Sequence, residues 1–228
     1  MTNLHELWKQ FKLLTDMQNL APEERKFMET FLAGEAMLKE QKRQEYLLRM
    51  SGIKRIKLLA DFDWAFNPKL PREKFMEFIN TWHTRPCNLV IIGPSGTGKT
   101  HAASALCYDA VVTGKQTVFL TLFDLTAKLS KARSVYSLID YYAKIPVLCI
   151  DEIGYVMPSR EHADHLFQII SKRSETGTTI VTTNLIPSLW GKIFDSTTAS
   201  AILDRLSLHG TFITFEGRSY RNKKNERV

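Results

Sequence analysis

The chain has 228 residues, of which 44% are hydrophobic, and it carries a net charge of +7 at pH 7; this length allows one full domain and a small accessory one. It contains no apolar run near the roughly 20 residues that span a bilayer, and its three cysteines are odd in number and far apart, which excludes a membrane-spanning helix, a disulfide framework and a cysteine-based zinc site. The first residues lack the basic-then-apolar pattern of a signal peptide, so we expect a cytoplasmic protein, and the excess of basic residues favours a polyanionic partner.

Two stretches with helical periodicity open the chain. Apolar residues recur at helical spacing over residues 4–17, and a second helix is predicted to begin at Pro22, a residue suited to the first helical turn. Gly34 is predicted to interrupt this second helix, and Ser51-Gly52 is predicted to end the pattern. We therefore expect a small all-helical domain over residues 1–57.

An irregular, aromatic segment follows at residues 58–85. Phe62, Trp64 and Phe66 lie close together in it, and this is not the composition of a flexible linker. We expect this entry segment to pack against the domain that follows, where an adenine ring could also stack on it.

Strand and helix patterns alternate from residue 86 onward. Residues 147–150 are apolar on both faces, as a central parallel strand requires. The sequence thus predicts a three-layer α/β domain with a parallel sheet over residues 58–228. The expected strands are at 88–92, 117–122, 147–151, 178–183 and 211–216, and the expected helices are near 99–113, 123–134, 160–174 and 198–208.

The first of these strands runs directly into a glycine-rich turn and a helix. The turn has the G-x-x-x-x-G-K-[S/T] form of a phosphate-binding P-loop. Its glycines let backbone N–H groups face a polyphosphate, and the helix points its positive N-terminal end at the same place. Lys99 can then reach the β- and γ-phosphates, the Thr100 hydroxyl can bind Mg²⁺, and His101 follows in the first helical turn. A structural glycine turn is the alternative. The residues expected to bind nucleotide are Gly93, Pro94, Ser95, Gly96, Thr97, Gly98, Lys99, Thr100 and His101.

Four further residues carry candidate chemistry. Asp151 and Glu152 end the strand at 147–151, where phosphoryl-transfer sites hold Mg²⁺ with one carboxylate and polarise an attacking water with a second. A charged pair where a strand meets solvent is the alternative. Asn184 ends the next strand, where its amide could orient the water or contact the γ-phosphate, or could simply form a turn. Arg205 lies on a predicted helix whose apolar face is formed by other residues, which leaves it available to a neighbour.

The order of these motifs resembles the IstB/DnaC-like group of AAA+ ATPases over nearly the whole chain. The segments that carry the resemblance are GPSGTGKTHAA, VLCIDEIGY, TTN, ILDRL and EGRSYR, and the entry segment DFDWAFNPKLPR is more similar to the IstB transposition helpers than to the helicase loaders. By position, the resemblance implies that Asn184 is the sensor 1 residue and that Arg221 is the sensor 2 arginine. It also implies that Arg205 is an arginine finger offered to the nucleotide of the adjacent subunit. The chain ends soon after the last strand, so we expect no separate helical lid domain.

In this clade the segment after the second strand lines the central channel of the oligomer and meets nucleic acid. The corresponding residues here are 124–133, in which Lys128, Lys131 and Arg133 fall within two helical turns. Such side chains suit contacts to phosphates without reading of the bases. An ordinary basic helix surface is the alternative.

We therefore expect a Mg²⁺-dependent ATPase that forms a homo-oligomeric ring or filament on double-stranded DNA and assists a transposase. A helicase loader of the same fold, which would hold a helicase with residues 1–57 and prefer single strands, is the first alternative. A small-molecule kinase would need an acceptor pocket and lid arginines, and would leave Asn184 and Arg205 idle. A non-catalytic protein that coats DNA and uses ATP only for assembly is the third alternative.

Overall fold

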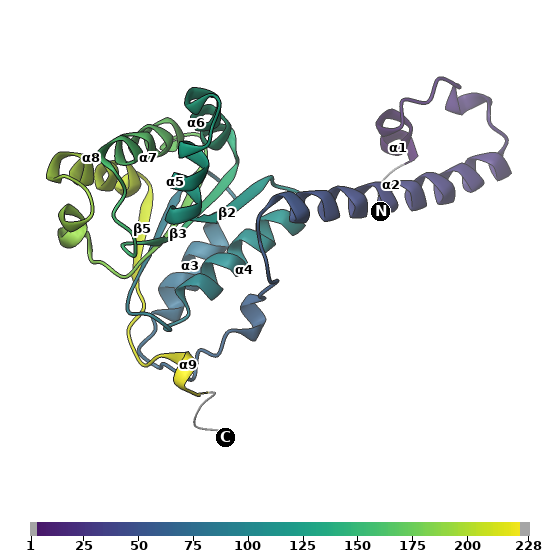
Figure 1. Ribbon diagram of the computed structural model, residues 1–228. Coiled ribbons are helices and arrows are strands. Elements are labelled where there is room, and N and C mark those ends of the chain that lie inside the picture. The colour runs from purple at the N-terminus through teal and green to yellow at the C-terminus, as the bar shows by residue number, and fades with distance from the viewer. Residues whose placement is uncertain (1–3, 224–228) are drawn as a thin grey trace. The chain divides into compact units, whose positions relative to one another are not determined.

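The computed structural model describes the backbone of residues 4–223 and the side chains through Arg221. Contacts between residues divide the chain into two compact units, and the division falls between Tyr46 and Leu47 (Figure 1). Over residues 4–223, no helix is both long enough and apolar enough to cross a membrane.

The N-terminal unit contains α1 (Leu4–Gln10), the 3-10 helix η1 (Met17–Asn19) and the first part of α2 (Pro22–Met50). Leu7 and Trp8 of α1 are buried together with Leu32 of α2. The expectation of one helix over residues 4–17 is wrong, because the chain leaves the helical path at Lys12, whose φ is 52°. The loop that follows is held by the Trp8 indole N–H, which donates to the Thr15 carbonyl at 2.8 Å.

The second helix is continuous, so the predicted interruption at Gly34 is wrong. Helix α2 runs for 29 residues from Pro22 to Met50. A glycine inside a helix costs about 1 kcal/mol relative to alanine, and the lysine, glutamate, glutamine and leucine residues around Gly34 favour the helix enough to offset that cost. The helix ends as expected before Ser51, whose hydroxyl donates to the Leu48 carbonyl at 2.7 Å.

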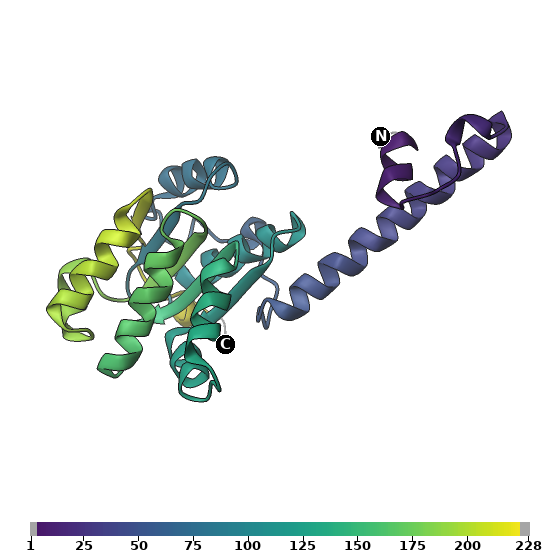
Figure 2. The ribbon, with the colours of Figure 1, turned by 90° about the horizontal axis from the view of Figure 1, so that it is seen from above.

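The second unit is built on a five-stranded parallel sheet with the order β2-β3-β4-β1-β5 (Figures 1 and 2). All four neighbouring pairs are parallel, which confirms the predicted fold class. Each predicted strand is present, with ends that differ by at most two residues. The strands are β1 (Asn88–Ile92), β2 (Thr117–Thr121), β3 (Val147–Ile153), β4 (Thr178–Thr183) and β5 (Gly210–Thr214).

Helices cover both faces of this sheet and give two hydrophobic cores. Leu89 and Ile91 of β1 pack in the core that contains α3 and α4, whereas Val90 and Ile92 pack in the core that contains the other long helices. This alternation follows from the two-residue period of a strand. The helices are α3 (Arg72–Thr81) and α4 (Lys99–Val112) on the first face, and α5 (Leu122–Ser130), α6 (Val135–Lys144), α7 (Arg160–Arg173) and α8 (Ser196–Ser207) on the second. Three short helices complete the unit: η2 (Leu59–Asp61), η3 (Pro187–Lys192) and α9 (Tyr220–Lys223).

Neither the three short helices nor two of the longer ones, α3 and α6, were predicted. Helix α3 lies within the entry segment, where the aromatic residues around it masked a ten-residue helical pattern. Helix α6 begins after Ser134, whose hydroxyl accepts from the Ser137 N–H at 3.3 Å. The predicted helix over 123–134 therefore ends early, because serine at a helix N-cap starts a new helix there.

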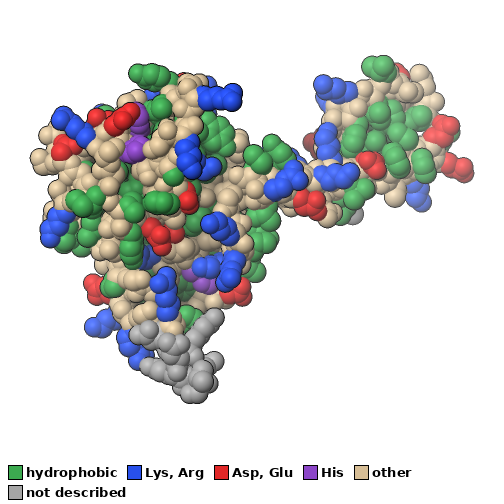
Figure 3. Space-filling view, viewed as in Figure 1, with side chains coloured by type: hydrophobic (Ala, Val, Ile, Leu, Met, Phe, Trp, Pro, Cys, Tyr) green, Lys and Arg blue, Asp and Glu red, His purple; other side chains and the backbone are tan. Residues whose placement is uncertain are grey.

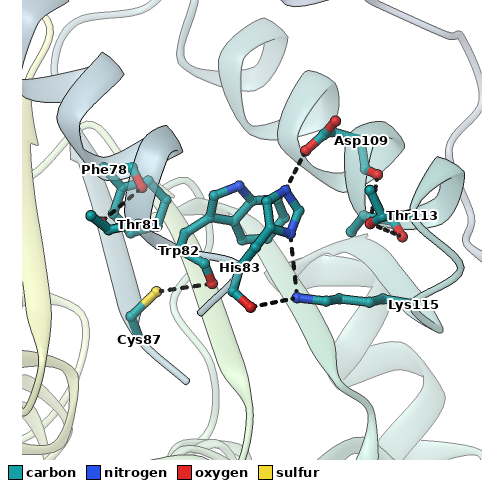
Figure 4. A network of polar contacts seen from close by, with 9 residues as sticks. Phe78, Thr81, Trp82, His83, Cys87, Asp109, Thr113 and Lys115 are labelled. Carbon is teal, nitrogen blue, oxygen red and sulfur yellow. Dashed lines mark hydrogen bonds and ion pairs between the residues drawn. The ribbon is translucent and has the colours of Figure 1, made fainter. Parts of the chain in front are cut away.

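The entry segment packs on the sheet through Phe62, Phe75 and Phe78. A polar network then joins its C-terminal end to α4 (Figure 4). The His83 ring lies between Asp109, at 2.7 Å from Nε2, and the Lys115 ammonium, at 3.3 Å from Nδ1. Because an ammonium group can only donate, Nδ1 accepts from Lys115 and the Nε2–H donates to Asp109.

One fully buried cation, Arg173 at the end of α7, joins three elements. Its guanidinium donates to the carbonyls of Tyr142 and Ile145 at 2.6 Å and to the Thr178 carbonyl at 2.6 Å. Arg173 thus supplies donors to the C-terminal end of α6, where carbonyl groups lack helical partners and favour a positive charge.

Candidate nucleotide site

The turn between β1 and α4 is held by close packing against three other parts of the unit. A Cβ atom added at Gly93 would overlap the Phe215 carbonyl, and one added at Gly96 would overlap the Ser219 side chain. At Gly98, where φ is 100°, it would lie 2.8 Å from the Phe62 ring. Glycine is therefore required at these positions for close approach as well as for backbone conformation.

The lysine of the turn lies inside the loop that it follows. Lys99 is 7% exposed, and its ammonium donates to the Pro94 carbonyl at 2.8 Å. Burial lowers the pKa of Lys99, and the positive charge of Arg221 adds to this effect, whereas Asp151 and Glu152 oppose it. The side chain is therefore already placed among the backbone groups that would surround a polyphosphate.

A cavity of about 240 Å³ opens beside this turn. One wall is formed by the turn and the first residues of α4, and another by aromatic and polar residues of the entry segment. The remaining wall comes from the ends of β3 and β4 and from α9. The lining includes Phe62, Phe66, Asn67, Lys99, Thr100, Glu152, Thr182, Tyr220 and Arg221.

His101, which was expected near the nucleotide, also lines this cavity. Its Nε2 lies 2.9 Å from the Leu58 carbonyl, and its ring meets Phe62 edge-on at 5.2 Å. This histidine therefore holds the start of the entry segment against α4.

The two carboxylates at the end of β3 point in different directions because the strand bulges there. The register between β3 and β4 shifts between Ile150 and Ile153, and Glu152 adopts a φ of 62°. A bulge places two residues opposite one and re-aims their side chains. Asp151 is consequently buried at 2% exposure, whereas Glu152 is exposed and faces the cavity.

Thr182 of β4 stabilises this bulge. Its hydroxyl donates to Asp151 Oδ1 and accepts from the Glu152 N–H at 3.0 Å. Strand β4 lies between β1 and β3 in the sheet, so its end reaches both the P-loop and the carboxylates. In the sequence, Thr182 stands only as a neighbour of Asn184 in the segment TTN, and no local pattern predicts this role.

Thr100 and Asp151 are arranged as a magnesium site would require. Thr100 Oγ1 lies 3.2 Å from Asp151 Oδ1, so one hydroxyl and one carboxylate oxygen meet at the edge of the cavity. Burial raises the pKa of Asp151, and the hydroxyls of Thr182 and Thr100 partly offset this effect. Mg²⁺ prefers a few such protein oxygens together with phosphate oxygens and water.

Five of the expected nucleotide-site residues do not line the cavity. Asp151 is buried beside Thr100 and Thr182. Gly93 and Pro94 form the base of the turn and lie behind it. Asn184 is exposed after β4, with its amide oxygen next to Gly154. Arg205 lies on α8, where its guanidinium pairs with Asp204 at 3.0 Å and its side chain is 43% exposed. Within one chain, therefore, Arg205 does not reach the cavity.

The three basic residues expected to contact DNA lie together on a second surface. Lys128, Lys131 and Arg133 line an open cavity of about 730 Å³ between α5 and α6, together with Ser134 and Tyr141. Lysine and arginine side chains beside serine hydroxyls suit phosphate contacts. On the face seen in Figure 3, Lys and Arg side chains are spread among acidic and hydrophobic ones rather than gathered in one patch.

A family model described as "IstB-like ATP binding protein" matches residues 1–228. Together with the five-stranded P-loop sheet, this match shows the class: the chain is a P-loop AAA+ protein. It belongs to the IstB-like family of ATP-binding proteins, as its resemblance to that group predicts.

Individual proteins are also similar to this chain in sequence or in fold. A protein named as an ATP-binding protein of insertion sequence IS232 from Bacillus thuringiensis subsp. berliner is 35% identical over 82% of this chain and 76% of its own length. One named for insertion sequence IS21 from Pseudomonas aeruginosa is 35% identical over 90% of this chain and 79% of its own length. A replicative helicase loader, DnaC of Buchnera aphidicola subsp. Baizongia pistaciae, is 25% identical over 84% of this chain and 82% of its own length. Among solved structures, that of DnaI is similar in fold, with a TM-score of 0.60 and 19% identity over 73% of this chain and 90% of that one.

Proposed function

We propose that this protein binds and hydrolyses ATP with Mg²⁺, assembles through ATP into a homo-oligomer on duplex DNA, and assists the transposase of an insertion sequence. The observation that carries this proposal is the cavity in which Lys99, Thr100 and Glu152 come together with the aromatic entry segment. The names of the relatives, which refer to insertion sequences, support the transposition context.

Within one subunit, the residues divide the work on ATP as follows. The P-loop N–H groups and Lys99 bind the phosphates, and Phe62 and Phe66 receive the base. Thr100 and Asp151 hold Mg²⁺, which neutralises charge on the β- and γ-phosphates when bound. The exposed carboxylate of Glu152, fixed by the bulge, accepts a proton from the attacking water.

Arg205 acts between subunits. Because Arg205 is exposed on α8 and outside its own cavity, we assign it to the nucleotide of an adjacent subunit, where its charge stabilises the transferring phosphoryl group. Asn184, after the end of β4, orients the attacking water or contacts the γ-phosphate in its own subunit, as expected of a sensor 1 residue. We also assign residues 1–57 to a separate helical domain, and residues 58–228 to the ATPase domain.

The test compares two variants, one expected to lose ATP binding and the other expected to lose DNA binding. Lys99→Ala should weaken binding of a fluorescent ATP analogue by about a hundredfold and abolish ATP-dependent assembly, because it removes a charged contact to phosphate. Replacing Lys128, Lys131 and Arg133 with alanine should leave ATP affinity within about twofold and weaken DNA binding. Unchanged ATP affinity in Lys99→Ala would defeat the proposed nucleotide site.

A helicase loader is the second candidate, and its support is the similarity to DnaC. A transposition helper should prefer duplex DNA and retain a transposase in a pull-down. A loader should prefer single strands and retain a replicative helicase. Parallel measurements of both preferences on the purified full chain separate the two functions.

A further inference from the structure

Two segments that are 151 residues apart in the sequence meet at the edge of the nucleotide cavity. The Asn67 side-chain amide donates to the Arg218 carbonyl at 2.9 Å, and the Arg218 N–H donates to Asn67 Oδ1, also at 2.9 Å. Asn67 is only 5% exposed. One side chain thus pairs with the backbone of Arg218 through a donor and an acceptor, and we call this pair the Asn67 clasp.

The residues beside the Asn67 clasp fit closely around it. Gly217 has a φ of 127°, and a Cβ atom there would overlap the Asn67 side chain. The Arg218 guanidinium lies 5.3 Å above the Phe66 ring, and Tyr220 meets the same ring edge-on at 5.0 Å. Residues 217–220 therefore rest on the entry segment rather than on the sheet.

The same segment reaches the phosphate end of the cavity. The Tyr220 N–H donates to the Gly96 carbonyl at 2.8 Å, and Ser219 packs where a Cβ of Gly96 would lie. Tyr220 and Arg221 both line the cavity, and the charge of Arg221 acts on Lys99. Helix α9, which presents Arg221, is only four residues long, and so short a helix does not hold its own position.

We propose that Asn67 is a positioning residue, which holds residues 217–221 against the entry segment and thereby keeps Arg221 directed at the phosphates of bound ATP. This inference rests on the proposed function, since it takes ATP as the occupant of the cavity. In this role Asn67 acts through Arg221 and not by direct contact with the γ-phosphate. The entry segment, which receives the base, and the C-terminal segment, which contacts phosphate, are then ordered together.

The first experiment examines the segment without nucleotide. Limited digestion with trypsin, read by mass spectrometry, reports cleavage after Arg218. Asn67→Ala should raise this cleavage rate about tenfold or more, and Gly217→Ala should do the same from the other side of the clasp. The matched control is Asn88→Ala: Asn88 is 2% exposed and its amide also makes two hydrogen bonds, to the Arg205 and Leu208 carbonyls. This control should leave Arg218 protected.

The second experiment measures affinity for a ribose-labelled fluorescent ATP. Arg221→Ala should weaken binding about ten- to hundredfold, as expected for loss of a charged contact. Asn67→Ala should weaken it about tenfold, and the double variant should be no weaker than Arg221→Ala alone, because residues that act as one unit do not add. Asn88→Ala should bind ATP like the wild-type protein.

Two results would overturn the inference: Arg218 as resistant to trypsin in both Asn67→Ala and Gly217→Ala as in the wild type, or losses of affinity that add in the double variant. Failure of the proposed function looks different, because the wild-type protein would then not bind ATP at all. The trypsin result does not depend on nucleotide, so it distinguishes failure of the role assigned to Asn67 from failure of the proposed ATP binding.

Discussion

Thr182→Val removes a single hydroxyl at the point where β3 and β4 meet beside the cavity. Thr182 is 1% exposed, and valine keeps nearly the same shape. The hydroxyl donates to the Asp151 carboxylate and accepts from the Glu152 N–H. A hydrogen bond to a charged group contributes about 1.5–3 kcal/mol, and an amide left without a partner costs about 1–3 kcal/mol. Because both interactions involve the same hydroxyl, we expect the free energy of unfolding to fall by about 2–4 kcal/mol rather than by the sum of the two contributions.

The same change should reduce turnover more than it reduces ATP binding. The Thr182 hydroxyl holds the N–H of Glu152, whose backbone is left-handed, and a misplacement of Glu152 near 1 Å costs about a hundredfold in rate. The Thr182 hydroxyl also lowers the pKa of Asp151. Loss of this hydroxyl should raise the pKa of Asp151 further, so that Asp151 becomes protonated at a higher pH. The acid limb of the ATPase rate–pH profile should then move to higher pH.

The measurements are urea unfolding without nucleotide and steady-state ATPase kinetics as a function of pH. Thr117→Val is the matched control, because Thr117 is also 1% exposed, but its hydroxyl donates to the Lys115 carbonyl just before β2, a strand that β3 separates from β4. We expect this control to lose about 1 kcal/mol of stability and to keep its turnover. Equal turnover and an unmoved acid limb in Thr182→Val would refute the role assigned to this hydroxyl.

Four further predictions follow from the same geometry. Glu152→Gln should bind ATP normally but hydrolyse it at least a hundredfold more slowly; near-normal turnover would exclude Glu152 as the proton acceptor. Arg205→Ala should lose ATPase activity and regain part of it when mixed with Glu152→Gln subunits, because an intact site forms wherever the nucleotide of an Arg205→Ala subunit meets Arg205 of a Glu152→Gln neighbour; an inactive mixture would contradict a shared site. Arg173→Met should lower the free energy of unfolding by about 3 kcal/mol, since it leaves buried carbonyls without donors, and urea unfolding measures this loss. DNA affinity should fall with salt, and alanine at Lys128, Lys131 and Arg133 should reduce the log–log slope by about 2–3 if each contacts one phosphate; an unchanged slope would remove them from the interface.

The parts of the fold that the sequence predicted are those specified by local pattern. Strand β3 is apolar on both faces, and that pattern places it in the middle of a parallel sheet without knowledge of its neighbours. The P-loop likewise combines a strand, a turn and a helix within adjacent residues, so its position needed no tertiary information. The predicted strand ends differ from the structure by at most two residues for this reason.

The parts that the sequence did not predict depend on contacts between distant residues. Thr182 acquires its role only because β4 lies between β1 and β3, and strand order is not written in any local pattern. Asn67 meets Arg218 across 151 residues, and Arg173 finds its carbonyl partners only after α6 and α7 have packed. Lys12, whose left-handed backbone ends α1 early, shows that periodicity alone overestimates a helix when a turn residue lies inside the pattern.

In the proposed function, ATP joins subunits of this protein on duplex DNA through a site that two subunits complete. Sedimentation velocity of the Glu152→Gln protein with a short DNA duplex tests it most directly, because this variant should retain ATP. We predict large DNA-bound assemblies with ATP and none without it. Single protomers at every protein concentration, with ATP and duplex both present, would contradict the claim.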